Sequence, residues 1–332
     1  MTALTNRPRH RRGTLTRRVV LTASARDPER FEPLLDSFVL RDDWQRARTR
    51  TVLGSFLRGY HAFARAVDLD EVHADLAGVD RYYRPFAYEG AAMGFGPWAF
   101  LNRRGYRDFD AVLGEFHPQT VYQNYVGLGW WLATRPALSR PGTAAVTGML
   151  HPHFRLLPYE GIGFRAGFLG AGRTSVTRSF ARYGAGPAHV CFQGYGRSLW
   201  FACMGDLGRA AALIGALPAE VHGDCWSGLG LGFAYSWLDR AEYLAQVVSW
   251  VPDEFRADFF QGTAFGWEAR QRADRPLFDA LTGRLGEAQR VYIAGSLRAV
   301  ARARDDLADR GVRDSFYLAW RAGTRTRLPA SP

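Results

Sequence analysis

The chain has 332 residues, a formal net charge of +11 and a hydrophobic content of 47%. All 43 basic residues are arginine, as a GC-rich genome produces, and they are scattered without a nucleic-acid-binding motif, so the charge does not indicate a nucleic-acid partner. No run of about 18 uncharged apolar residues is present, and we expect no transmembrane helix. Three cysteines without Cys-x-x-Cys spacing indicate neither a disulfide framework nor a zinc site, and favour reduced thiols in the cytoplasm.

The N-terminal part of the chain divides into two segments. Residues 1–30 carry eight arginines and few large apolar groups, which predicts a disordered basic tail. Residues 31–68 supply an apolar face made of Phe38, Trp44, Phe56 and Phe63. Because the end unit of a repeat array must cover the apolar surface of its neighbour, we expect this segment to cap the first repeat.

A three-residue motif, here called the repeated phrase, then occurs six times. Its first residue is aromatic, its second usually carries a carboxylate or amide, and its third is usually glycine. The copies are Tyr88-Glu89-Gly90, Tyr122-Gln123-Asn124, Tyr159-Glu160-Gly161, Phe192-Gln193-Gly194, Trp226-Ser227-Gly228 and Phe260-Gln261-Gly262. Their third positions are separated by 34, 37, 33, 34 and 34 residues, and fainter copies occur at Gly59 and Gly295. A period of about 34 is the length of a helix-turn-helix unit such as the tetratricopeptide repeat.

Prolines recur with nearly the same period, at Pro85, Pro118, Pro152, Pro187, Pro218 and Pro252. Apolar residues spaced by three and four precede Pro118, Pro218 and Pro252, which predicts a helix ending before each of them. The sequence therefore predicts an all-α fold of tandem helical hairpins of about 34 residues, forming a solenoid like that of tetratricopeptide repeats or an α/α toroid. We expect a single helical-repeat domain over residues 31–304.

Residues 305–332 are predicted to form a C-terminal cap and tail, closed by Phe316, Tyr317 and Trp320. Asp305, Asp306 and Asp309 resemble the magnesium-diphosphate motif of class I terpene synthases. Arginines surround them, however, which favours an exposed helix stabilised by ion pairs.

The middle residue of each repeated phrase occupies an equivalent place in its unit. These six residues should therefore form a polar ladder along one surface: Glu89, Gln123, Glu160, Gln193, Ser227 and Gln261. In helical solenoids this is commonly the concave binding surface. The alternative is that the ladder caps helices or bridges neighbouring repeats by hydrogen bonds.

The many glycines have two interpretations as well: close helix–helix contact, or backbone access for a ligand. Aromatic residues beside the ladder suggest an apolar, unsaturated or aromatic ligand. The candidate ligand-binding residues are Tyr88, Gln123, Tyr159, Gln193, Trp200, Trp226 and Gln261.

Glu89, Glu160 and Asp224 are the candidate catalytic acids or bases. Packed helices lie about 8–10 Å apart, so, unless the superhelix closes tightly, we expect Glu89 and Glu160 to be more than about 15 Å apart, which is too far for a glycosidase pair. For Asp224 the alternative is a helix N-cap. The sequence contains no fingerprint of a cofactor or metal site, and we predict neither.

Five blocks of the chain resemble the family known as domain of unknown function 1702, the UnbL-type proteins of enediyne polyketide gene clusters. They are Tyr88-Glu89-Gly90-Ala91-Ala92-Met93-Gly94, Gly127-Leu128-Gly129-Trp130, Tyr159-Glu160-Gly161-Ile162-Gly163-Phe164, Gly194-Tyr195-Gly196-Arg197-Ser198-Leu199-Trp200-Phe201 and Trp226-Ser227-Gly228-Leu229-Gly230. The resemblance implies a role in processing or protecting a linear polyene made by an iterative polyketide synthase. It brings no catalytic residues with it.

Three functional hypotheses are compatible with these features. The first is an accessory protein, without a cofactor, that binds a hydrophobic polyene and cyclises or isomerises it, with polyketide synthase or other pathway proteins as partners. The second is a non-catalytic scaffold for protein interactions. The third is an enzyme like the terpene cyclases, acting on a polyprenyl chain.

Overall fold

The computed structural model describes residues 31–66, 68–101, 107–134, 142–170, 172–204, 206–313 and 315–330. The predicted basic tail, residues 1–30, lies outside these ranges. Every regular element in the described ranges is helical, and none is a strand, which confirms the all-α prediction. None of the described helices is long and apolar enough to cross a membrane.

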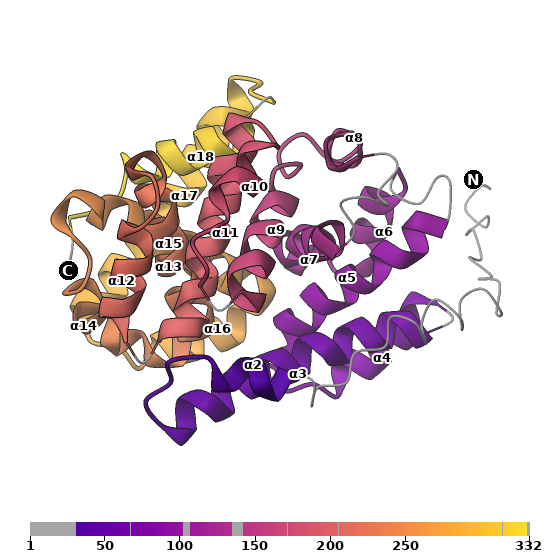
Figure 1. Ribbon diagram of the computed structural model, residues 1–332, viewed down its shortest axis with the longest axis horizontal. Helices are drawn as coiled ribbons and strands as arrows, with labels where there is room; N and C mark the ends of the chain where they lie inside the picture. The colour runs from indigo at the N-terminus through magenta and orange to yellow at the C-terminus, as the bar shows by residue number, and fades with distance from the viewer. Residues whose placement is uncertain are drawn as a thin grey trace.

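Eight longer helices make up most of the molecule (Figure 1). They are α3 (Asp43–Arg65), α5 (Arg84–Leu101), α7 (Val121–Thr134), α9 (Leu157–Leu169), α11 (Ala185–Cys203), α13 (His222–Ser236), α15 (Arg256–Ala273) and α17 (Glu287–Asp309). From α3 to α17, each packs against the next. The six repeated phrases lie one on each helix from α5 to α15.

Shorter helices connect the long ones. They are α2 (Glu32–Asp36), α4 (Leu69–Ala77), α6 (Phe109–Phe116), α8 (Thr143–Thr147), α10 (Thr177–Ala181), α12 (Leu207–Gly215), α14 (Leu244–Val248), α16 (Arg275–Thr282) and α18 (Phe316–Arg325), with 3-10 turns η2 (Pro118–Thr120), η3 (Ala219–Val221), η4 (Leu238–Tyr243) and η5 (Asp253–Phe255). The helices α6, α12 and α14 end before Pro118, Pro218 and Pro252, as predicted. Each of these prolines opens or precedes a 3-10 turn that leads into the next long helix.

The recurring glycines lie where neighbouring long helices touch. A Cβ atom on Gly161 of α9 would stand 2.0 Å from the carbonyl oxygen of Val126 on α7. A Cβ on Gly129 of α7 would stand 1.9 Å from the carbonyl oxygen of Pro158 on α9. The same reciprocal approach joins α9 to α11, α11 to α13 and α13 to α15. Only glycine permits such contact, so these positions serve the close packing of helices. The faint copy at Gly59 makes the same approach to Ala87, whereas the one at Gly295 does not.

Segments far apart in the sequence meet on one side of the molecule (Figure 1). Arg81, before α5, pairs with Asp274, the N-cap of α16, at 2.6 Å. Arg48 on α3 pairs with Asp239 in η4. The row of helices therefore bends back until its first members contact η4 and α16, which lie much later in the chain.

The C-terminal segment closes the structure through α18, whose Phe316, Tyr317 and Trp320 are buried. The predicted boundary after Arg304 falls inside α17, which continues without interruption to Asp309. On the surface of α17, Asp305 pairs with Arg304 and Asp306 pairs with Arg327, as the interpretation of an ion-paired helix predicts.

Candidate functional site

The polar ladder lies inside the molecule and not on an open concave surface. Its six members are between 0% and 4% exposed: Glu89, Gln123, Glu160, Gln193, Ser227 and Gln261. Three of them form a chain across successive helices. Gln193 Nε2 donates to Ser227 Oγ at 3.1 Å, and Ser227 Oγ donates to Gln261 Oε1 at 2.7 Å. For these three, the interpretation of hydrogen bonds between neighbouring units is correct.

One arginine joins the two glutamates of the ladder. Arg197 of α11 lies 2.7 Å from Glu160 of α9 through Nε and 3.2 Å from Glu89 of α5 through its terminal nitrogen. The width of a guanidinium then limits the separation of the two carboxylates to about 8 Å. The expected separation of more than about 15 Å is wrong, because it assumed an open row of helices and the row bends back on itself. Sequence reasoning missed Arg197 as a site residue, although it lies in the most specific block of the family resemblance.

The charges of this triad are not balanced when both carboxylates are ionised. Burial raises the pKa of Glu160 to about 7, with a further contribution from the nearby Glu89 charge, although Arg197 opposes the rise. Burial likewise raises the pKa of Glu89. The two carboxylates raise the pKa of Arg197 in spite of its burial. Near neutral pH the triad therefore retains a proton on a glutamate for part of the time.

Two small cavities flank Arg197. One, of about 40 Å³, is lined by Gln123, Glu160 and Tyr235 among others. The other, of about 30 Å³, is mainly aromatic and includes Glu89. Each has room for water molecules but not for an extended hydrocarbon chain.

Asp224 has ion-pair partners other than Arg197. It pairs with His189 Nδ1 at 2.6 Å and with Arg321 at 2.8 Å. The hydrogen bond with Asp224 raises the pKa of His189. Asp224 is not a helix N-cap, because α13 begins after Val221 and places Asp224 in its first turn. Of the three candidate catalytic residues, Glu89 and Glu160 therefore share Arg197, whereas Asp224 pairs with His189 and Arg321.

A larger pocket opens on the surface between α3, α11, η4 and α14. Its volume is about 370 Å³, within the usual range for small-molecule sites. Its aromatic lining residues are Trp44, Trp200, Trp237, Tyr243 and Trp250. Trp44, Tyr243 and Trp250 are 37%, 40% and 48% exposed, unusually high for side chains of this size. The other lining residues include Arg41, Arg240, Asp42, Met204 and Val247.

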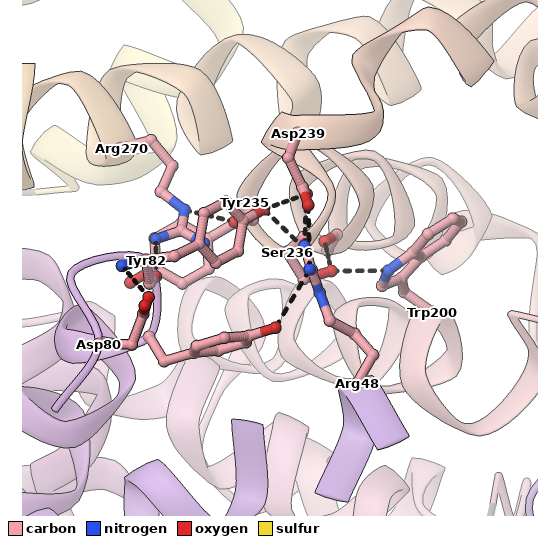
Figure 2. A network of polar contacts seen from close by, with 10 residues as sticks. Arg48, Asp80, Tyr82, Trp200, Tyr235, Ser236, Asp239 and Arg270 are labelled. Carbon is pink, nitrogen blue, oxygen red and sulfur yellow. Dashed lines mark hydrogen bonds and ion pairs between the residues drawn. The ribbon is translucent and has the colours of Figure 1, made fainter. Parts of the chain in front are cut away.

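The floor of this pocket is held by the polar network of Figure 2. Trp200 Nε1 donates to Ser236 Oγ at 2.7 Å. The carbonyl oxygen of Ser236 accepts from Arg48 at 2.8 Å and from the Tyr82 hydroxyl at 3.0 Å (Figure 2). Arg48 and Tyr82 both bond to Asp239 as well. The contacts that hold α3 against α13 and η4 therefore also fix the pocket.

The pocket walls are aromatic rings in edge contact. Trp237 meets Trp200 with centroids 4.9 Å apart and Trp44 with centroids 5.3 Å apart, both edge to face. The guanidinium of Arg240 lies 5.0 Å from the centroid of the Trp44 ring. Rigid buried rings thus form the back of the pocket, and exposed rings form its rim.

Trp200 is the one predicted ligand-binding residue that lines this pocket. Gln123 lines the 40 Å³ cavity, and Tyr88 stacks on His117 with centroids 4.0 Å apart. The Tyr159 hydroxyl lies 3.2 Å from Thr147 Oγ1, and Trp226 is 2% exposed. Sequence reasoning missed the other pocket aromatics because Trp44, Trp237, Tyr243 and Trp250 lie outside the repeated phrase.

The described fold and sites define an all-helical protein with a buried Glu–Arg–Glu triad and an aromatic surface pocket. The sequence model of the family described as "Protein of unknown function (DUF1702)" matches residues 14–328. The chain belongs to this family. Comparison with curated proteins gives no match, and neither does comparison with solved structures.

Proposed function

We propose that this protein binds an elongated, unsaturated hydrophobic molecule in the pocket between α3, α11, η4 and α14. The observation that carries the proposal is the set of five aromatic side chains around a 370 Å³ space, three of them left exposed at its rim. Aromatic faces and edges stack well on a flat conjugated chain, and each buried ring adds apolar contact area. Exposed aromatic side chains gathered in this way mark binding surfaces.

The family resemblance gives this ligand a chemical context. The UnbL-type proteins of enediyne gene clusters accompany an iterative polyketide synthase that makes a linear polyene, which is the kind of molecule the pocket suits. We therefore propose an accessory protein of enediyne or related polyketide biosynthesis, acting in the cytoplasm with pathway proteins as partners. We also propose that its helical hairpins are tandem repeats of a solenoid or toroid, since the glycine contacts recur from one pair of long helices to the next.

The residues that line the pocket favour a protein that binds or protects its ligand over an enzyme that converts the ligand by acid–base catalysis. Asp42 is the acidic residue that lines it, and this carboxylate accepts from the backbone of Gln45 as the N-cap of α3. Glu89 and Glu160 border the small interior cavities instead. The polyprenyl alternative is less favoured, because Asp305 and Asp306 are paired with arginines on an exposed helix.

The test is a titration of the purified protein with a linear conjugated polyene, followed by tryptophan fluorescence and by mass spectrometry of the bound material. We expect saturable quenching, and an affinity reduced about tenfold in Trp250→Ala, since this variant removes an exposed indole that the bound chain would cover. The control is Val291→Ala, which removes an exposed apolar side chain of α17 away from the pocket. Absence of binding, or equal binding by the wild type and Trp250→Ala, would overturn the proposal.

A further inference from the structure

The aromatic pocket is lined by two arginines that make no ion pair with the described carboxylates. Arg41 and Arg240 both line it, and neither makes an ion pair within the described part of the chain. Neighbouring arginines differ in this respect: Arg46 is paired with Asp36, and Arg48 with Asp239. With Asp42 as the lining acid, the pocket has a formal charge of one positive unit.

Arg240 is placed to act together with the aromatic wall. Its guanidinium stands over the ring of Trp44, which fixes the side chain without consuming its hydrogen-bond donors. Arg240 is partly buried, so an anion beside it would be partly removed from water, and the attraction would be stronger than on an open surface. Arg48 also lies near the Trp44 ring, at 5.4 Å, but its donors are used by Asp239 and the Ser236 carbonyl. Arg240 and Arg41 thus remain free for a ligand.

We infer that the ligand is amphiphilic: an unsaturated chain that ends in a carboxylate. The chain lies against Trp44, Trp237 and Trp250, and the carboxylate is held by Arg240 and Arg41. A guanidinium binds a carboxylate through two parallel hydrogen bonds, and the single negative charge matches the single positive charge of the pocket. A diphosphate carries more negative charge than the pocket balances. This inference rests on the proposed function and specifies the class of ligand.

The experiment compares parinaric acid, a fluorescent conjugated tetraene acid, with its methyl ester. Both are titrated into the full-length protein at pH 8, where a carboxylic acid with a pKa of about 4–5 is ionised. We expect the acid to bind about tenfold more tightly than the ester, because a charge-assisted hydrogen-bonded pair is lost in the ester. The affinity of the acid, and not that of the ester, is expected to fall as salt is added.

Three variants separate the contributions of charge and of aromatic contact. Arg240→Gln and Arg41→Gln are expected to bring the acid-to-ester affinity ratio towards one, because each variant lowers the affinity for the acid more than that for the ester. Trp250→Ala is expected to weaken both probes by the same factor. The control Arg302→Gln removes the same charge from an exposed position on α17 and is expected to preserve the ratio.

The outcomes distinguish this inference from the proposed function. Equal binding of acid and ester by the wild type, or an acid-to-ester ratio unchanged in both Arg240→Gln and Arg41→Gln, would overturn the carboxylate inference and leave the hydrophobic pocket standing. Failure of both probes to bind would overturn the two together.

Discussion

Glu160 on α9 lies 2.7 Å from Arg197 on α11, at the centre of the molecule, where both side chains are almost completely buried. Since Arg197 also pairs with Glu89, one guanidinium serves two carboxylates in an interior that solvates neither. The free energy of unfolding is therefore expected to depend on pH and on Arg197. The glycine contacts between helices and the hydrogen bonds beneath the pocket lead to further predictions about stability and ligand binding.

The contribution of the buried Glu160 to stability is expected to fall as pH rises. Burial raises its folded-state pKa from 4.5 to about 7, so the folded protein holds a proton that the unfolded chain has released. Between these two values the folded state binds more protons at Glu160, and the contribution of Glu160 to the unfolding free energy decreases with pH by roughly 3 kcal/mol. Glu160→Gln, an isostere of the protonated acid, is expected to lack this decrease. The measurement is urea unfolding at pH 4.5, 6 and 8.

The control for this series is Glu254→Gln, which alters an exposed carboxylate in η5. It is expected to track the wild type at every pH. If the difference between Glu160→Gln and the wild type stayed constant from pH 4.5 to 8, Glu160 would not hold the proton.

Replacing Arg197 is expected to lower the free energy of unfolding more than replacing Glu89 or Glu160. Arg197→Met leaves two carboxylates buried without a partner, and we expect a loss of about 3–5 kcal/mol at pH 8. The loss is expected to be smaller at pH 5, because burial raises the pKa of both acids and favours their neutral forms. The triple variant Arg197→Met, Glu89→Gln, Glu160→Gln is expected to recover most of the stability. Equal losses at both pH values would contradict the role given to Arg197.

The surroundings of Gly161 and Gly54 predict that Gly→Ala changes at the two positions have opposite effects on the stability of the protein. At Gly161 the added Cβ would stand 2.0 Å from the Val126 carbonyl oxygen, so the two helices must separate, and we expect a loss of more than about 3 kcal/mol. At Gly54, within α3, nothing lies within 4 Å of the added Cβ. Alanine there is expected to stabilise the protein by about 0.5–1 kcal/mol through its helix propensity. Thermal unfolding of the two variants, compared with the wild type, measures both effects.

The pocket floor predicts that a buried hydroxyl supports ligand binding. Ser236→Ala removes the acceptor of Trp200 Nε1 and leaves a buried N–H without a partner, at a cost of about 1–3 kcal/mol. We expect weaker binding of the polyene probe in addition, because Trp200 loses its fixed orientation. Thr326→Ala, which alters an exposed hydroxyl bonded to the Gly323 carbonyl, is the control. Unchanged stability and affinity in Ser236→Ala would show that the network does not position the pocket.

Local features were predictable from the sequence, and long-range ones were not. The helix ends before Pro118, Pro218 and Pro252 follow from backbone chemistry, and the glycine period follows from the length of one helical pair. The bend that brings Glu89 to within reach of Arg197 accumulates over several helix crossings, and no short stretch of sequence encodes it. The pocket was missed for a related reason. An exposed Trp250 and a buried Trp267 look alike in sequence, and only the packing of distant segments separates them.

The most direct test of the central claim is to map where a polyene binds. A conjugated polyene acid that carries a photoreactive group can be cross-linked to the full-length protein and the labelled peptides identified by mass spectrometry, with unlabelled polyene acid as competitor. The aromatic pocket predicts competitor-sensitive labelling in the segments from Arg41 to Gln45 and from Trp237 to Trp250. Competitor-sensitive labelling confined to other surfaces, or labelling that the competitor does not reduce, would contradict it.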